Sequence, residues 1–356
     1  MKKNRLILLI ALALIFIALA YTYNDAKSTL SSKESTFAVA DTSLITKIFL
    51  SDKSNHHLTL IKKSPGDWRI NDSLPAKDDE INTLLKTIKK VEVKETVPKT
   101  ARENVLTRLS TIGVKVEIYQ TVYRIDFLGL ELFPHEKLVK TYYVGDQTQN
   151  LMGTYMILED AEIPYITHVP GFNGYLSSRF SPLINDWRDQ TIFNIELVNI
   201  KSVKMEIPSE PEQSYLVENA GNNNFKLMSV SRNAYIANYD TTNLLRFLSA
   251  FKNIRYESMV TDFKLHNKDS IIMTTPYHIL TVTDITGKSL SIKTFHKKPY
   301  EGEMELDGTP MIYDKDRLYA LFNYNKDFAI IQFYVFDNIL RPLSYFIKTA
   351  PVSEKK

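Results

Sequence analysis

The stretch FAVADTSLITKIFL, Phe37–Leu50, is matched later in the chain by FNIELVNIKSVKMEI, Phe193–Ile207. Once a gap of one residue is allowed, the apolar residues of the two stretches follow each other in the same order. The matched pairs are Phe37 with Phe193, Ile45 with Ile200, Ile48 with Val203, and Leu50 with Met205. A repeated apolar spacing of this kind predicts two similar units that begin on the same strand.

The two copies continue with the same order of predicted elements. HLTLIK, His57–Lys62, corresponds to YLVEN, Tyr215–Asn219, and both alternate as strands do. After a turn, Trp68 and Ile70 correspond to Phe225 and Leu227. Each copy then changes to helical spacing, with Asp240 as a predicted N-cap of the second helix. The apolar residues of the two helices are Ile81, Leu84, Leu85, Ile88 and Val91, and Leu244, Leu245, Leu248 and Phe251.

The second half of each copy consists of further strand-like segments. In the first copy these include Gly113–Tyr119, Tyr123–Gly129 and Lys140–Asp146; in the second, HILTVTD and SLSIKTF flank a hairpin turn at Gly287. Short turns between strands indicate antiparallel pairing. We therefore predict an α+β fold of two tandem repeats of a mainly antiparallel sheet with one helix packed on each. The repeats span 37–192 and 193–348, and a flexible tail spans 349–356.

The N-terminus has the pattern of a membrane anchor. A basic start, residues 1–5, precedes an apolar run at 6–23, and a polar linker follows at 24–36. As a helix, the run would span about 27 Å, enough for a thin bilayer. The basic residues predict a cytoplasmic N-terminus and a single-pass inner-membrane protein whose bulk is periplasmic. The alternative is a signal peptide cleaved after the ALA at Ala18–Ala20, with secretion to the periplasm.

Composition excludes several classes of function. Without Lys2, Lys3 and Arg5, the 44 basic residues fall to 41, which equals the 41 acidic residues. Nucleic-acid binding depends largely on phosphate neutralisation, so we expect no nucleic-acid partner. The chain has no cysteine. It therefore has no disulfide, thiolate metal site, cysteine nucleophile or lipidated cysteine.

The sequence carries no recognisable catalytic motif. The histidines lack the spacing that places two metal ligands on one helical face; they are His56, His57, His135, His168, His266, His278 and His296. Asp314–Arg317 and Glu305–Gly308 do not complete a calcium-loop pattern. Asp186–Asp189, DWRD, is interpreted as an interdomain salt-bridge network rather than a ligand clamp, and Trp68 as a core residue rather than a sugar-stacking one. No catalytic, cofactor-binding or metal site is predicted.

Several segments resemble the DUF4340 family, in particular its single-anchor members of Bacteroidota type. They are FAVADTSLITKIFL, GDWRIN, LSTIGVKVEIY, YYVGDQTQNLMGTYMIL, FSPLINDWRDQTIF and DRLYALFNYNKDFAIIQFYVFDNILRPLSYF. The resemblance implies no known activity and no site residues. It does imply an association with ABC-transporter permease and auxiliary subunits of the gliding-motility type.

The sequence and the resemblance together favour a non-enzymatic, membrane-anchored accessory or scaffold protein outside the inner membrane. Its expected partners are the membrane, through the N-terminal helix, and ABC-transporter subunits. The alternative is an envelope glycan-binding protein or a cell-wall-acting enzyme. An enzyme of that kind would need two carboxylates that converge in a cleft.

Overall fold

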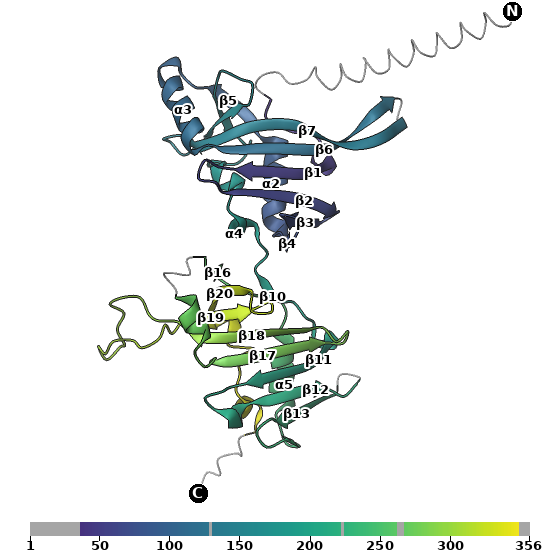
Figure 1. Cartoon of the computed structure of the whole chain (residues 1–356), viewed down its shortest axis with the longest axis vertical. Helices are drawn as coiled ribbons and strands as arrows, with labels where there is room; N and C mark the ends of the chain where they lie inside the picture. The colour runs from purple at the N-terminus through teal and green to yellow at the C-terminus, as the bar shows by residue number, and fades with distance from the viewer. Residues whose placement is uncertain (1–35, 128–129, 222–223, 262–266, 349–356) are drawn as a thin grey trace, which may run out of the picture. The chain divides into compact units, whose positions relative to one another are not determined.

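A computed structural model describes residues 36–127, 130–221, 224–261 and 267–348. The chain divides into two compact units, Met1–Asp189 and Gln190–Lys356; the boundary expected from the sequence lies between residues 192 and 193. Each unit is built on one 9-stranded sheet (Figure 1). The fold class is α+β with mainly antiparallel sheets, as predicted.

In the first unit the strand order is β4-β3-β2-β1-β6-β7-β8-β9-β5, and every neighbouring pair is antiparallel. The strands are β1 (Ile45–Ser51), β2 (His57–Ser64), β3 (Asp67–Ile70), β4 (Leu74–Pro75), β5 (Glu92–Thr96), β6 (Val114–Phe127), β7 (Leu130–Gln147), β8 (Thr154–Leu158) and β9 (Tyr165–His168). The helices are α2 (Asp78–Lys90), α3 (Lys99–Ile112) and α4 (Ile184–Trp187), with 3-10 turns η1 (Thr42–Leu44) and η2 (Ser177–Phe180).

The second unit has the order β14-β13-β12-β11-β17-β18-β19-β20-β16, and a separate pair joins β10 to β15. The strands are β10 (Thr191–Phe193), β11 (Ile200–Glu206), β12 (Tyr215–Asn219), β13 (Phe225–Ser229), β14 (Ala234–Tyr235), β15 (Ile254–Arg255), β16 (Ser258–Met259), β17 (His278–Asp284), β18 (Ser289–His296), β19 (Arg317–Phe322) and β20 (Asp327–Gln332). The helices are α5 (Thr241–Ser249), α7 (Lys268–Ile272) and α8 (Phe333–Phe336), with 3-10 turns η3 (Leu197–Asn199), η4 (Pro211–Gln213) and η5 (Leu343–Phe346).

The registers of the two large sheets correspond residue by residue around β1 and β11. Ile48 lies opposite Ile118 in β6, and its predicted counterpart Val203 lies opposite Val282 in β17. In both pairs the register shifts directly after the first strand residue, Ile45 or Ile200. A β-bulge at the same position of both strands bends them in the same way. All the apolar residues that the sequence matched between the two strands are buried: Ile45, Ile48, Leu50, Ile200, Val203 and Met205.

Helices α2 and α5 form where helical spacing was predicted. Acidic residues fill the first turn of α2 and Lys89 and Lys90 its last turn, which suits the helix dipole. Asp240 caps α5 as predicted, because its side chain accepts a hydrogen bond from the Asn243 N–H at 2.9 Å. Of the apolar residues at helical spacing in α5, Leu245 does not face the sheet, since its side chain is 45% exposed. Phe247 is buried in its place, because it continues the stripe of positions three and four residues apart that faces the sheet.

The prediction of one helix per unit was wrong for both units, because the first also contains α3 and α4 and the second also contains α7 and α8. Only Val105 and Leu109 of α3 are fully buried, so its apolar pattern is weak. Gly145 of β7 allows the helix to approach, because a Cβ there would lie 2.8 Å from Cδ2 of Leu109. This helix closes a second, smaller core with Val97 and Ile157.

Two predicted strand boundaries also differ from the structure. The segments 113–119 and 123–129 were predicted as separate strands, but β6 runs through both, because β7 pairs with it along its whole length. The run AIIQFYVF leaves the sheet at its end, where α8 replaces the strand. Within the described residues, no helix is long and apolar enough to cross a membrane. The predicted anchor at 6–23 lies outside the described residues.

Candidate functional site

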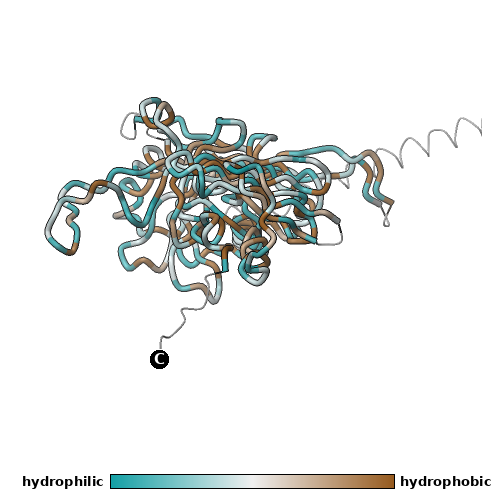
Figure 2. Tube along the Cα trace, turned by 90° about the horizontal axis from the view of Figure 1, so that it is seen from below, coloured by the Kyte–Doolittle hydropathy of each residue, from teal (hydrophilic) through white to brown (hydrophobic). Residues whose placement is uncertain are grey.

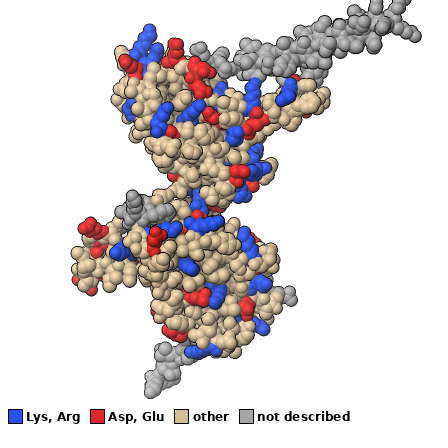
Figure 3. Space-filling model, viewed as in Figure 1, with Lys and Arg blue, Asp and Glu red and all other residues tan. Residues whose placement is uncertain are grey.

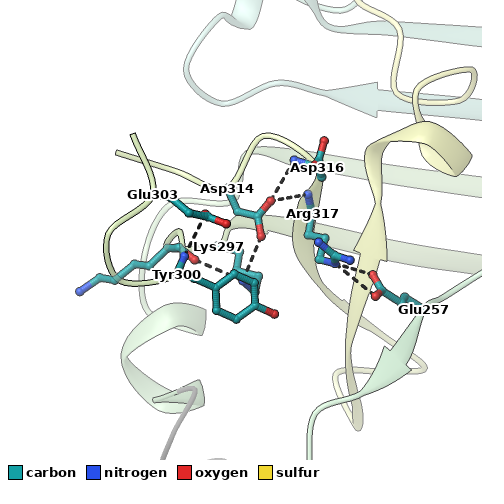
Figure 4. Close-up of polar contacts among 8 residues, drawn as sticks. Glu257, Lys297, Tyr300, Glu303, Asp314, Asp316 and Arg317 are labelled. Atoms are coloured by element: carbon teal, nitrogen blue, oxygen red, sulfur yellow. Dashed lines mark hydrogen bonds and ion pairs between the residues drawn. The ribbon is translucent and has the colours of Figure 1, made fainter. Parts of the chain in front are cut away.

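The most buried pair of opposite charges that the structure describes lies in the second unit, where β18 ends and β19 begins. Lys297 directly follows β18 and Asp314 precedes β19, and their side chains are only 5% and 6% exposed. The Lys297 Nζ lies 2.9 Å from Oδ2 of Asp314 (Figure 4). The chain between them, residues 298–313, leaves the body of the unit and returns to it, so this ion pair closes the base of a long loop.

The Asp314 carboxylate is fully engaged at this position. Its Oδ1 accepts hydrogen bonds from the backbone N–H groups of Asp316 at 2.9 Å and Arg317 at 3.0 Å. Burial alone would raise the pKa of Asp314, but the Lys297 ammonium and these N–H groups outweigh it and hold the pKa below its usual range. Lys297 also lies 4.2 Å from the ring centre of Tyr300. The carboxylate is therefore held ionised and shielded.

A second ion pair, between Arg317 and Glu257, links β19 to the edge of the sheet. The Arg317 Nε donates to both carboxylate oxygens of Glu257, at 2.8 and 3.2 Å (Figure 4). The hydrogen bond to Glu257 raises the pKa of the Arg317 guanidinium. Because Glu257 directly precedes β16, this contact joins the edge strand β16 to β19. The carboxylates of Asp314 and Glu257 are thus each neutralised by a cation, Asp314 by Lys297 and Glu257 by Arg317.

Aromatic rings are stacked beside the ion pairs. The ring centres of Tyr277 and His296 are 4.2 Å apart, and those of His296 and Tyr313 are also 4.2 Å apart. His278 lies against Tyr277, and burial lowers its pKa to about 4, so it is neutral at physiological pH. A shallow cavity of about 400 Å³ adjoins the stack; its lining residues are His296, Glu305, Ile312, Tyr313, Asp314, Lys315 and Phe333.

This arrangement suits structural support better than catalysis. A general acid or base needs a carboxyl group that can exchange its proton near the working pH. The lowered pKa of Asp314 and its three hydrogen bonds remove it from that role. The loop held by the pair exposes several apolar side chains, which are Tyr300, Met304, Leu306 and Ile312. The cluster therefore fixes the base of a loop that presents an apolar surface.

The other histidines weighed in the sequence are dispersed. His56 lies 2.8 Å from the Asp52 carboxylate on an exposed turn, and His57 and His135 are exposed. His168 is half-buried in β9, and His266 lies outside the described residues. Among the residues described, no group of three or more histidine or acidic side chains is arranged to hold a metal ion.

Both tryptophans belong to the core of the first unit. Trp68 is buried, as predicted, and Trp187 is buried with its Nε1 donating to the Ser181 carbonyl at 2.8 Å. The DWRD segment is hydrogen-bonded through its backbone to β4 and the residues after it. The Lys77 N–H donates to the Trp187 carbonyl, and the Asp189 N–H donates to the Pro75 carbonyl. The salt-bridge network predicted for Asp186–Asp189 stays a prediction.

The sequence around Asp314 does not reveal its ion pair with Lys297. The DKDR segment was weighed as part of a calcium loop, whereas the structure gives the Asp314 carboxylate an ammonium partner in place of a metal ion. No sequence pattern around Lys297 indicated that it pairs with a carboxylate. No short-range spacing connects it to Asp314, because the two residues meet only when β18 and β19 pair.

Charged side chains of both signs are mixed over the surface in view, without a continuous basic area (Figure 3).

A family model described as "Domain of unknown function (DUF4340)" matches residues 68–270. That match covers parts of both units and ends before Lys297. No curated protein and no solved structure matches the chain.

Proposed function

This chain belongs to the DUF4340 family, and we propose that it is a membrane-anchored, non-enzymatic accessory or scaffold protein. The observation that carries the proposal is the closed ion-pair cluster of Lys297, Asp314, Glu257 and Arg317. Its charges are satisfied by one another, and it holds a loop that exposes apolar side chains. A protein built to bind other proteins needs such a rigid support beneath its contact surface.

The two units act as tandem copies of one binding module. The shared strand order and the bulge after Ile45 and Ile200 are what a duplication of one unit leaves behind. The apolar run at 6–23 anchors the chain in the inner membrane, and the units lie on its periplasmic side. Cleavage of that run would instead release the same two units into the periplasm.

The partner is a membrane-transport assembly of the ABC type. This part of the proposal rests on the resemblance to the family and on the predicted anchor, which would hold the chain beside integral membrane subunits. The test is affinity purification of the tagged full-length chain from crosslinked native membranes, followed by identification of the captured proteins. Recovery of permease or auxiliary subunits supports the proposal, whereas their absence with two crosslinkers of different chemistry contradicts it.

A matched control separates specific capture from general membrane recovery. The variant Leu306→Ser/Ile312→Ser removes apolar side chains from the exposed loop and leaves the Lys297–Asp314 pair intact. If the loop contributes to partner binding, this variant recovers less of the transporter than the unchanged chain does. Envelope glycans are the alternative ligands, and a glycan array probed with the same chain tests them. Binding there that is lost in Tyr313→Ala would favour the alternative.

A further inference from the structure

The far part of the β6–β7 hairpin extends beyond the rest of its sheet (Figures 1 and 2). We call residues 121–127 and 130–136 the distal ribbon. Strand β1 pairs with β6 only as far as Gln120, and β8 pairs with β7 only from Tyr142 onward. The distal ribbon is therefore two strands wide. A ribbon of two strands is only marginally stable in water by itself, so a covering surface is expected.

The two faces of the distal ribbon differ in chemistry. In an antiparallel pair, residues directly opposite each other point to the same face. Ile125 lies opposite Leu132 on one face. Leu130, near the tip, lies on the same face, and its side chain is 57% exposed. On the other face Asp126 lies opposite Glu131. Near its tip the ribbon is thus apolar on one face and charged on the other, where the alternation also places Arg124.

Phe133 directly follows Leu132, so the alternation of the strand places it on the face of Glu131. Its side chain is 64% exposed, and its backbone has a φ of 58°, in the left-handed region that bulky residues rarely adopt. Strained backbone of this kind concentrates at sites of function.

The chain joins the first unit beside the base of the distal ribbon. The Lys140 Nζ, on β7, donates to the Thr36 carbonyl at 2.8 Å, and the Gln120 side chain donates to the Asp41 carbonyl at 2.5 Å. The predicted linker, residues 24–36, leads from this point to the predicted anchor. A flexible chain of that length has an average end-to-end distance of about 20 Å and a limit of about 45 Å. The ribbon itself extends about 25 Å from its base, a distance that lies within the reach of a linker of this length.

We propose that the apolar face of the distal ribbon inserts into the lipid interface of the bilayer that holds the anchor. This inference rests on the anchoring in the proposed function. Its attachment is apolar rather than electrostatic, because the inserting face carries Ile125, Leu130 and Leu132, whereas the charged side chains lie on the opposite face. Zwitterionic phospholipid is therefore sufficient. With the anchor and the ribbon both held, the first unit has two points of attachment to the membrane.

Single-cysteine labelling tests this directly, because the chain has no cysteine of its own. The full-length chain is reconstituted into phosphatidylcholine vesicles with an environment-sensitive fluorophore at Leu132→Cys. We expect a blue shift of its emission and a loss of intensity when the acyl chains carry bromine. Glu131→Cys, the next residue on the opposite face, is expected to give a smaller loss. Tyr235→Cys, an exposed site in the second unit, is expected to give none.

The outcomes separate this inference from the proposed function. If the chain floats with the vesicles but Leu132→Cys is quenched no more than Tyr235→Cys, the ribbon does not insert and only this inference is overturned. Equal quenching at Glu131→Cys and Leu132→Cys overturns insertion by the apolar face. If the chain does not float with the vesicles, the anchoring itself is refuted. Unchanged tryptophan emission from Trp68 and Trp187 shows that each variant keeps the first unit folded.

Discussion

Replacing Asp314 by asparagine tests whether the buried ion pair holds the second unit together. The amide keeps the size of the side chain and leaves an oxygen to accept from the N–H groups of Asp316 and Arg317. It removes the negative charge that faces the Lys297 ammonium at 2.9 Å. Breaking a buried pair from one side leaves an uncompensated charge, which costs about 3 kcal/mol of the free energy of unfolding. With a urea dependence of about 2 kcal/mol per molar, the midpoint falls by about 1.5 M.

The two units can be followed separately in one unfolding experiment. Both tryptophans of the chain, Trp68 and Trp187, belong to the first unit. Tryptophan fluorescence therefore reports the unfolding of the first unit, whereas far-UV circular dichroism reports both units. We expect Asp314→Asn to move one part of the dichroism transition to lower urea and to leave the tryptophan transition where it is.

Two matched variants complete the design. Asp316→Asn removes a carboxylate from the same loop at an exposed position, and we expect a change below about 0.5 kcal/mol. Replacing both partners, in Lys297→Met/Asp314→Asn, removes both buried charges, keeps an oxygen for the N–H groups of Asp316 and Arg317, and is expected to recover most of the lost stability. The interpretation of the pair as structural support is refuted if Asp314→Asn and Asp316→Asn unfold at the same urea concentration.

Three further predictions concern single contacts. Asp240→Ala removes the cap on the Asn243 N–H and lowers the stability of the second unit by about 1 kcal/mol; Asp240→Ser keeps the cap and serves as the control in the same dichroism assay. Burial lowers the pKa of His278 from 6.5 to about 4, so between these pH values the unfolded chain binds a proton that the folded chain does not. Stability is complete above that range and falls by on the order of 3 kcal/mol as the pH drops through it; urea unfolding of His278→Leu from pH 7 to 4 should lack this component. Gly145→Ala places a Cβ 2.8 Å from Leu109 Cδ2 and 3.1 Å from the Tyr155 carbonyl, and the crowding lowers the tryptophan transition by about 1–3 kcal/mol; an unchanged midpoint would contradict the close packing of α3.

The sequence predicted the parts of the fold that rest on local apolar spacing. Ile45, Ile48 and Leu50 are spaced by three and then two residues, and the same spacing returns at Ile200, which was sufficient to find both central strands. Helix α5 was found for the same reason, together with its cap at Asp240. Helix α3 was missed because its burial depends on Gly145, a residue far along the chain that provides space without any pattern of its own.

The distal ribbon and the ion-pair cluster depend on contacts that local patterns do not record. The residues from Gln120 to Val122 looked like a break between strands, yet β7 pairs straight across them. Lys297 and Asp314 meet through the pairing of β18 with β19, and neither residue has a neighbour in sequence that indicates the other. Charged residues are usually exposed, so their burial here had no sequence signal.

The place of β1 in its sheet determines the order in which each unit can fold. Strand β1 pairs with β2 across a short turn, but its other neighbour, β6, begins only at Val114, after two helices and β5. During synthesis the β1–β4 meander can form first, while the second edge of β1 stays open until the rest of the unit has emerged. Closing so long a loop is slow, and an open edge is a site for pairing with other chains. The apolar spacing of β1 then specifies the register of the arriving strand, because a slip of one residue would turn its buried side chains away from the core.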